Sequence, residues 1–223
     1  METVLTPAAT SLDPARTALV VVDLTTFDAD PDGGLAKVFA EDGVDLAYYW
    51  KRLAGDVLPN SARMLDAFRA AGARIVFTRV GAQFGDYGDS QPHIRDLHRR
   101  SGSLRGTRQF DVLAELVPRQ GEAVVDKAGS SAFGTGNLDI LLRNAGVTDV
   151  VFCGVITNAC VLLSALAAWD LGYSVSIVDD ACGANSEEIH ASALSVAGWL
   201  GCHVVSTAQV VAGIGAGTPV QRG

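Results

Sequence analysis

Three residues of chemically reactive types follow short apolar runs in this chain. Asp23 lies at the end of TALVVVDL, Lys127 ends EAVVDK, and Cys160 follows DVVFCGV after a four-residue turn. A thiolate is a strong nucleophile, and a nearby ammonium group stabilises it. A carboxylate can take the thiol proton and return it to a leaving group. If the three side chains meet, they can attack a carbonyl carbon.

Each of these residues also has a purely structural interpretation. Free cysteine is often buried, aspartate is common where strands end, and lysine usually lies on the surface. The stretch LLSALAAWDLG directly after Cys160 predicts a helix. The positive end of a helix favours thiolate over thiol, so we expect this position to lower the pKa of the Cys160 thiol. The coincidence of all three residue types at strand ends favours chemistry over packing.

Apolar runs of strand length alternate with stretches of helical spacing. We expect six strands, at 17–24, 73–80, 122–127, 149–155, 173–181 and 202–207. Helices are expected at 57–72, 137–146, from about 158, and at 186–201 with Ser186 as N-cap, whereas 81–110 is expected to be a loop. This alternation predicts an α/β fold, a three-layer αβα sandwich around a six-stranded parallel sheet. Ligands bind at the carboxyl ends of such strands, where the three residues stand.

Composition excludes several classes of partner. The 223 residues carry a formal net charge of −8, and no basic stripe occurs, so we expect no nucleic acid partner. No run of 18 apolar residues predicts a membrane span. The start of the chain does not resemble a signal peptide, and the four cysteines form no CxxC pair, so we expect a reduced, cytoplasmic protein. No repeat or linker divides the chain, and residues 1–223 are expected to form a single domain.

Three blocks of sequence share a pattern with one known superfamily. They are ALVVVDL, VVDKAGSSAFGTGNLDILLRNAGV, with Lys127, Ser131, Phe133 and Thr135, and VVFCGVITNACVLLSALAAWDLGYSVSIVDDACGA. Through them the chain resembles the isochorismatase-like cysteine hydrolases. That superfamily includes nicotinamidases, N-carbamoylsarcosine amidases, ureidoacrylate hydrolases and biuret hydrolases. The resemblance covers roughly residues 16–212, the core of the expected domain.

The resemblance implies a catalytic triad of Asp23, Lys127 and Cys160. It also implies a cis peptide bond between Val155 and Ile156. The backbone N–H groups of Ile156 and Cys160 would then form the oxyanion hole for the substrate carbonyl oxygen. The implied reaction is thiolate attack on a carbonyl, loss of ammonia or an amine, and hydrolysis of the thioester by a water that Asp23 activates. No cofactor takes part in this reaction.

The substrate pocket is expected in the loops that follow the first three strands. Five residues are candidates for binding substrate: Thr25, Phe27, Arg79, Gln83 and Phe133. Many relatives carry glutamine where this chain has Thr25. The planar guanidinium of Arg79 suits a carboxylate or a ureido oxygen, and pairing with an acidic residue is the alternative. Phe27 and Phe133 have core packing as their alternative.

A metal site is not expected. Nicotinamidases carry an aspartate and histidines after the second strand that bind a metal, and FTRVGAQFGDYGDSQPHI lacks such a set. Isolated histidines such as His93 and His98 are more often solvent-facing or hydrogen-bonded than ligands. This segment and the DACGA turn favour a ureide hydrolase, such as biuret hydrolase, over a nicotinamidase.

Three functions are compatible with the sequence. The favoured one is a cysteine amidohydrolase that cleaves a C–N bond of a small amide or ureide. The alternative is an isochorismatase-type vinyl-ether hydrolase that uses Asp23 as general acid without the cysteine. The third is a non-catalytic binding module, against which the intact triad argues. The apolar helices predict burial, with a subunit interface as one place for it, and the resemblance implies a homo-dimer or homo-tetramer. Tyr48, Tyr49 and Trp50 predict a lid, a subunit contact or core packing.

Overall fold

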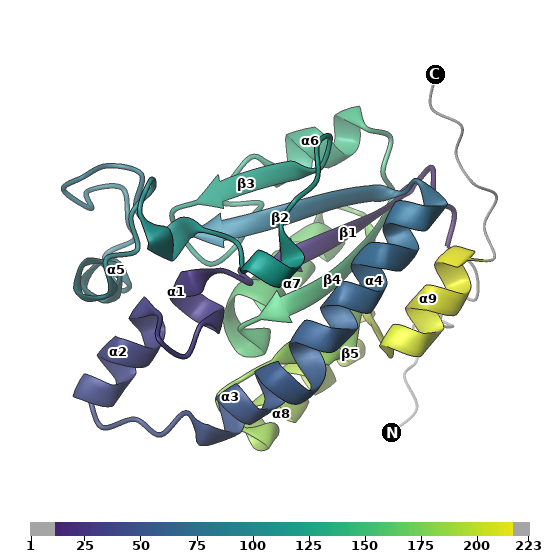
Figure 1. Cartoon of the computed structure of the whole chain (residues 1–223). Coiled ribbons are helices and arrows are strands. Elements are labelled where there is room, and N and C mark those ends of the chain that lie inside the picture. Colours follow the sequence, from purple (N-terminus) through teal and green to yellow (C-terminus); the bar gives the residue numbers. More distant parts are fainter. Residues whose placement is uncertain (1–11, 216–223) are drawn as a thin grey trace.

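A six-stranded sheet forms the middle layer of the protein, with helices on both of its faces (Figure 1). The computed structural model describes residues 12–215. All neighbouring strands pair in parallel, in the order β3-β2-β1-β4-β5-β6. The strands are β1 (Thr17–Val22), β2 (Arg74–Val80), β3 (Ala123–Lys127), β4 (Asp149–Val155), β5 (Ser174–Gly183) and β6 (His203–Val205). The predicted three-layer αβα sandwich is confirmed.

The helical elements divide between the two faces and the loops. The α-helices are α1 (Thr26–Ala29), α2 (Gly34–Glu41), α3 (Ala47–Arg52), α4 (Leu58–Ala71), α5 (Arg95–Ser101), α6 (Leu138–Asn144), α7 (Leu162–Asp170), α8 (Glu187–Leu200) and α9 (Thr207–Gly215). Two π-helical turns, η1 (Leu53–Val57) and η4 (Thr157–Val161), and two 3-10 turns, η2 (Arg108–Phe110) and η3 (Ala114–Leu116), complete the described chain. Helices α4 and α9 lie side by side on one face of the sheet.

Strand β1 shows why the central strands are apolar throughout. Leu19 and Val21 pack into the core beneath α4 and α9. Ala18, Val20 and Val22 point the other way, into the core beneath α6, α7 and α8. Successive side chains of a strand face opposite sides of a sheet, and both sides are covered here. A strand buried on both faces is therefore almost entirely apolar, and only Thr17 at the start of β1 is polar.

The helices that flank the sheet have ordinary end signals. Helix α4 stops at Gly72, which adopts the left-handed conformation with φ +66°. Ser186 caps α8 by accepting a hydrogen bond from the backbone N–H of Ile189 at 3.2 Å. Glu187 and Glu188 lie in the first turn of α8, where their negative charges interact favourably with the positive end of the helix dipole. The predicted helix end near residue 72 and the predicted Ser186 cap are both confirmed.

Several helical segments depart from the sequence prediction. The expected loop 81–110 contains α5 and the turn η2, and α2, α3 and α9 were not predicted. These four helices have nine residues or fewer, which is too short for a helical period to be told from a short apolar run. Tyr49 of α3 is fully buried, which is the core-packing alternative. The helix after β4 begins with the π-helical turn η4, because the chain must turn sharply before α7 starts.

The chain leaves the sheet in opposite directions after β1 and after β4. From β1 it builds β2 and β3, and from β4 it builds β5 and β6, so the two carboxyl ends border the crevice where ligands bind in open α/β sheets. Val22 pairs with Gly154 at this point. Gly154 has φ +110°, and a Cβ there would overlap the carbonyl oxygen of Val22. Only glycine allows β1 and β4 to approach this closely.

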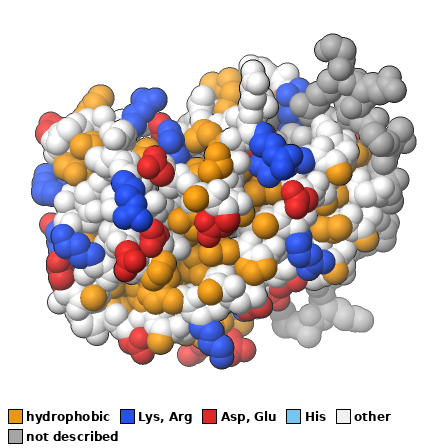
Figure 2. Space-filling model, viewed as in Figure 1, with side chains coloured by type: hydrophobic (Ala, Val, Ile, Leu, Met, Phe, Trp, Pro, Cys, Tyr) orange, Lys and Arg blue, Asp and Glu red, His pale blue; other side chains and the backbone are white. Residues whose placement is uncertain are grey.

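The surface carries charges of both signs. Figure 2 shows Lys and Arg side chains next to Asp and Glu on the face covered by α4 and α9. One such group links α5 to α2, where Arg100 pairs with Glu41 and Asp42 at 3.2 and 2.6 Å. Exposed pairs of this kind contribute little to stability, because water and salt screen them. Among residues 12–215, no helix is both long and apolar enough to cross a membrane.

Candidate active site

The ammonium group of Lys127 lies between a carboxylate and a thiol. Its Nζ is 2.8 Å from Oδ2 of Asp23, donates a hydrogen bond of 3.3 Å to Sγ of Cys160, and donates one of 3.0 Å to the carbonyl oxygen of Gly129. A lysine has three N–H donors, so these contacts occupy all of them. Lys127 and Asp23 are both 0% exposed, and Cys160 is 8% exposed. The structure therefore brings the three predicted triad residues together.

Asp23 is held by the strand next to its own. It adopts a left-handed backbone conformation with φ +50°, which aspartate tolerates better than most residues. The Thr78 hydroxyl on β2 donates to Oδ1 of Asp23 at 2.7 Å and accepts from the Asp23 backbone N–H at 3.3 Å. One carboxylate oxygen thus contacts Thr78 and the other contacts Lys127. This fixes the carboxylate plane.

The loop after β3 places Gly129 beneath the ammonium group. The Thr135 hydroxyl accepts a hydrogen bond from the Gly129 N–H at 3.1 Å and donates one to the Ser131 carbonyl at 2.8 Å. The Ala132 N–H donates to the hydroxyl of Ser164 on α7 at 3.1 Å. Ser131 and Thr135 of the second sequence block therefore shape the loop and do not contact the thiol.

The charge states of the triad follow from its burial. Burial disfavours the charge of Lys127, but the neighbouring Asp23 and Cys160 more than compensate and raise the pKa of its ammonium group. Burial also raises the pKa of the Cys160 thiol, and Lys127 reverses this only in part. The prediction of a lowered thiol pKa was wrong, because burial outweighs the effect of the Lys127 ammonium group. The resting site contains a thiol beside an ion pair.

Asp28 is a second buried carboxyl group at this site, and it was not predicted. It lies in α1, is 5% exposed, and its backbone carbonyl accepts a hydrogen bond from the Tyr49 hydroxyl at 2.8 Å. Among the described residues, its Oδ2 has no hydrogen-bond partner. Burial and the charge of Asp23 raise the pKa of Asp28 well above its ordinary value, although Lys127 opposes them. One ammonium balances one carboxylate, so the shift of the Asp28 pKa favours its protonated form.

Replacing Asp28 with asparagine is expected to stabilise the folded protein increasingly as the pH rises. The folded state holds the Asp28 proton to a higher pH than the unfolded chain, in which the pKa is about 3.9. Stability is therefore lost as the pH rises through this window. Between the unfolded and the folded pKa of Asp28, the variant's advantage in free energy of unfolding over the wild type should grow by about 1.4 kcal/mol per pH unit.

Urea unfolding of both proteins across the acidic and neutral range measures this difference. Asp56→Asn is the control for removing an exposed carboxylate, because Asp56 lies exposed on η1. If the difference in free energy of unfolding between Asp28→Asn and wild type stays constant with pH, Asp28 has the same pKa in the folded and unfolded states, and the prediction is wrong.

The five predicted substrate-binding residues occupy different environments. Thr25 is buried next to the triad, and its hydroxyl has no partner among the described residues. Phe27 is 2% exposed and belongs to the core beneath α4, and Phe133 packs against the opposite core and the Tyr173 ring. For both, this is the packing alternative. The Gln83 side chain is exposed. Binding of substrate by these residues stays a prediction.

Arg79 is engaged in an ion pair. Its Nη2 is 2.6 Å from Oδ1 of Asp126, and its guanidinium stacks over the Phe110 ring at 5.3 Å from the centroid. Arg105 binds the other oxygen of Asp126 at 3.1 Å. Arg79 lies directly opposite Asp126 in the β2–β3 register. The structural ion pair that the sequence left open is therefore present.

The turn that carries the thiol begins with a cis peptide bond between Val155 and Ile156, as the resemblance implied. Cys160 lies in η4, whose wider π-helical winding is frequent at functional sites. Among residues 12–215, no group of three or more His, Cys, Asp or Glu side chains is arranged to hold a metal ion. His93 is exposed, and buried His98 is bonded to the Ser90 hydroxyl at 2.9 Å. Burial lowers the pKa of His98 to about 4, so it is neutral at pH 7.

The family model of the isochorismatase domain matches residues 17–209. The chain belongs to the isochorismatase family. Two ureidoacrylate amidohydrolases RutB, from Agrobacterium fabrum and Serratia proteamaculans, are each 31% identical to this family member over 189 residues. The matches cover 78% of this chain, and 79% and 73% of the two relatives.

Solved structures of the isochorismatase family have the same fold. A cysteine hydrolase from Pseudomonas syringae pv. phaseolicola superposes with a TM-score of 0.81 at 24% identity, covering 96% of this chain and 98% of its own. An N-carbamoylsarcosine amidase from Thermoplasma acidophilum superposes with a TM-score of 0.64 at 25% identity, covering 86% and 96%.

Proposed function

We propose that this protein is a cysteine amidohydrolase that cleaves a C–N bond of a small amide or ureide. The observation that carries the proposal is the position of the Lys127 ammonium, which contacts both Oδ2 of Asp23 and Sγ of Cys160 inside a buried site. This arrangement joins a nucleophile, a cation and a proton acceptor. The names of the relatives, which act on ureidoacrylate and N-carbamoylsarcosine, support the substrate class.

In the first half of the proposed reaction, Sγ of Cys160 attacks the substrate carbonyl carbon while Asp23 accepts the thiol proton. Asp23 is a hydrogen-bond partner of the thiol, so the proton has a direct path. Lys127 balances the negative charge during the transfer. The tetrahedral intermediate then collapses, the C–N bond breaks, and Asp23 returns the proton to the leaving nitrogen as ammonia or an amine departs.

In the second half, a water molecule attacks the thioester. Asp23 takes one proton from this water as the new C–O bond forms. The C–S bond then breaks, and the proton returns to Sγ, which restores the thiol. The net change is the addition of one water across the C–N bond. The backbone N–H groups of Ile156 and Cys160 are our candidates for binding the carbonyl oxygen in both halves.

The polar groups around the triad suit a small, uncharged amide or ureide group. The protonated form of Asp28, which burial favours, can donate a hydrogen bond, and the Thr25 hydroxyl can both donate and accept. Neither oxygen has a partner among the described residues, so a ligand that bonds to them would remove the cost of two unpaired buried polar atoms. We propose that five residues contribute to substrate binding: Thr25, Phe27, Arg79, Gln83 and Phe133. In this proposal Arg79 acts through its ion pair with Asp126.

We also propose that the protein is a cytoplasmic homo-dimer or homo-tetramer. The four cysteines are all free thiols, which suits a reducing compartment. Large apolar side chains stand exposed on α7 and α8: Leu163, Trp169, Ile189, Val196 and Trp199. Such a cluster is typical of a protein–protein interface. Sedimentation velocity would contradict this assembly if the protein stayed monomeric at micromolar concentration.

Ammonia release from a panel of small amides and ureides tests the function. The panel contains biuret, ureidoacrylate, N-carbamoylsarcosine, maleamate and nicotinamide. We expect saturable release from at least one ureide, little from nicotinamide, and no change when a chelator is added. The chelator arm matters because no metal takes part in the proposed cycle.

Two outcomes would contradict the proposal. Loss of activity with chelator and recovery with added metal would replace the thiol mechanism by a metal-dependent one. The absence of release from every compound, together with turnover of a vinyl ether such as isochorismate, would assign the site to acid catalysis by Asp23.

A further inference from the structure

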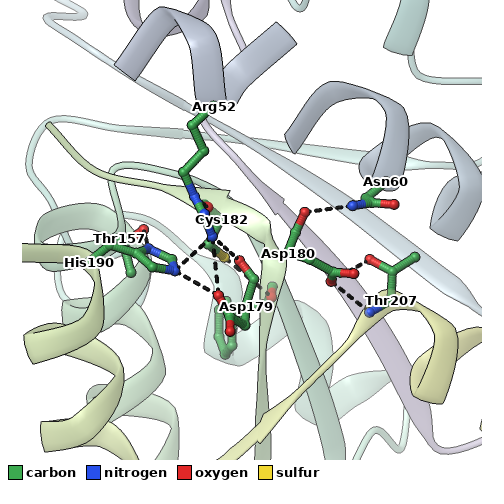
Figure 3. Close-up of polar contacts among 9 residues, drawn as sticks. Arg52, Asn60, Thr157, Asp179, Asp180, Cys182, His190 and Thr207 are labelled. Atoms are coloured by element: carbon green, nitrogen blue, oxygen red, sulfur yellow. Dashed lines mark hydrogen bonds and ion pairs between the residues drawn. The ribbon is translucent and has the colours of Figure 1, made fainter. Parts of the chain in front are cut away.

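A second polar cluster surrounds His190 and reaches the turn that carries the thiol through Thr157 (Figure 3). Nδ1 of His190, on α8, is 2.9 Å from the hydroxyl of Thr157. Nε2 of the same ring is 2.8 Å from Oδ1 of Asp179 on β5 and 2.8 Å from Nη2 of Arg52 on α3. Arg52 also donates to the Asp179 carbonyl at 2.9 Å and to the Cys182 carbonyl at 2.8 Å. Three elements thus converge on one imidazole.

Thr157 belongs to the same π-helical turn as the nucleophile. It is the first residue of η4 and precedes Cys160 by three positions. Its side chain is 1% exposed, and His190 is 4% exposed. The polar contact to His190 therefore anchors the turn from the side of α8, whereas Lys127 contacts it from the side of β3. His190 touches no triad residue.

The hydrogen bonds restrict the protonation of His190. Arginine only donates, so Nε2 either accepts from Arg52 or carries a proton and donates to Asp179. In the first case Nδ1–H donates to Thr157, and in the second Nδ1 accepts from the Thr157 hydroxyl. Thr157 is bonded in both arrangements, because a hydroxyl can serve either role.

The groups that face the ring keep it uncharged at neutral pH. Burial lowers the pKa of His190, and the positive charge of Arg52 acts in the same direction. Asp179 and Glu187 oppose them without reversing the shift. A neutral ring has one donor and one acceptor nitrogen, which satisfies Thr157 on one side and the Arg52–Asp179 pair on the other.

We propose that His190 is a positioning residue that holds the nucleophile turn through Thr157, so that Sγ of Cys160 stays in contact with Lys127. This inference rests on the function proposed above. The bond acts on the geometry of the turn and not on the substrate, so its loss should lower kcat and leave KM nearly unchanged. A displacement of about 1 Å at a reacting atom can cost on the order of 100-fold in rate.

A matched pair of amide variants separates the two sides of the ring. In His190→Asn the amide stands where Nδ1 was and keeps the bond to Thr157, whereas in His190→Gln it stands where Nε2 was and keeps only the contacts to Arg52 and Asp179. We expect kcat of His190→Asn within about threefold of wild type and kcat of His190→Gln lowered by about 10–100-fold. KM should change less than about twofold in both.

Thr157 provides the reciprocal test. Thr157→Val removes the hydroxyl at constant shape and should match His190→Gln, and Thr157→Ser should restore the rate. The double variant that combines Thr157→Val with His190→Gln should be no slower than either single variant, because both lose the same bond. If His190→Gln does not fold, the Thr157→Val and Thr157→Ser pair decides the question.

Alkylation of Cys160 by iodoacetamide, followed by peptide mass spectrometry, gives a readout that needs no substrate. Loss of the contact to Lys127 lowers the thiolate fraction, so His190→Gln and Thr157→Val should react more slowly than wild type. Equal alkylation rates and equal kcat in wild type and His190→Gln would overturn the inference, as would equal losses in the Asn and Gln variants. Alkylation differences without turnover of any amide would support the positioning role and contradict the amidohydrolase function.

Discussion

Replacement of Lys127 by methionine is expected to abolish amide hydrolysis and to lower the free energy of unfolding by about 3–5 kcal/mol. The Lys127 side chain is fully buried and pairs with the equally buried Asp23 at 2.8 Å. Methionine fills a similar volume but leaves the Asp23 carboxylate without its counter-charge. The thiol also loses its only contact with a cation in the triad, so turnover should fall on the order of 10³-fold or more.

A second substitution separates the two effects of losing Lys127. In the double variant Asp23→Asn with Lys127→Met, no charge remains unpaired, and most of the lost stability should return while activity stays absent. Lys37→Met on the exposed side of α2 is the matched control and should behave as wild type. Urea unfolding and ammonia release measure both quantities. A stable, active Lys127→Met variant would show that the buried ion pair serves neither folding nor catalysis.

Replacement of Cys160 by alanine is expected to lower kcat by on the order of 10⁴-fold while the protein stays folded. The thiol supplies the bond to the substrate carbonyl, and water alone cannot replace it in the same position. Cys160 is 8% exposed and its shape is close to that of alanine, so we expect a change in stability of about 1 kcal/mol or less.

The control for Cys160→Ala is Cys202→Ala. Cys202 is a buried thiol outside the triad, and its removal should leave turnover within about twofold of wild type. Full turnover by Cys160→Ala would point instead to acid catalysis by Asp23, as expected for a vinyl-ether hydrolase. Mass spectrometry of wild type during turnover would in addition detect the acyl group on Cys160.

The sequence was sufficient to predict that Asp23, Lys127 and Cys160 meet. Asp23 and Lys127 stand at the ends of apolar runs and Cys160 just beyond one, and parallel strands bring those ends to one edge of the sheet. Buried parallel strands have a strong apolar signal, which is why all six were predicted within a few residues. The apolar runs alone therefore predict which residues lie at the carboxyl edge of the sheet, but they do not predict the structure of the loops.

Other features of the site depend on contacts that local sequence does not encode. Asp28 was not predicted, because the four residues of α1 are too few to show a helical period. The Arg79–Asp126 pair depends on the register between β2 and β3, which becomes visible only in the folded sheet. The thiol pKa was misjudged because the sequence shows the helix that follows Cys160 but not the burial that surrounds the sulfur.

The close approach of β1 and β4 at Gly154 makes the width of the catalytic crevice a property of the main chain. Asp23 directly follows the strand on one side of this contact, and the turn with Cys160 follows the strand on the other. Because Gly154 has no side chain, β1 and β4 lie close together, and the backbone sets the distance between Asp23 and the turn that carries Cys160. Changes in the surrounding loops can therefore alter substrate preference without altering the distance over which a proton passes between Cys160 and Asp23.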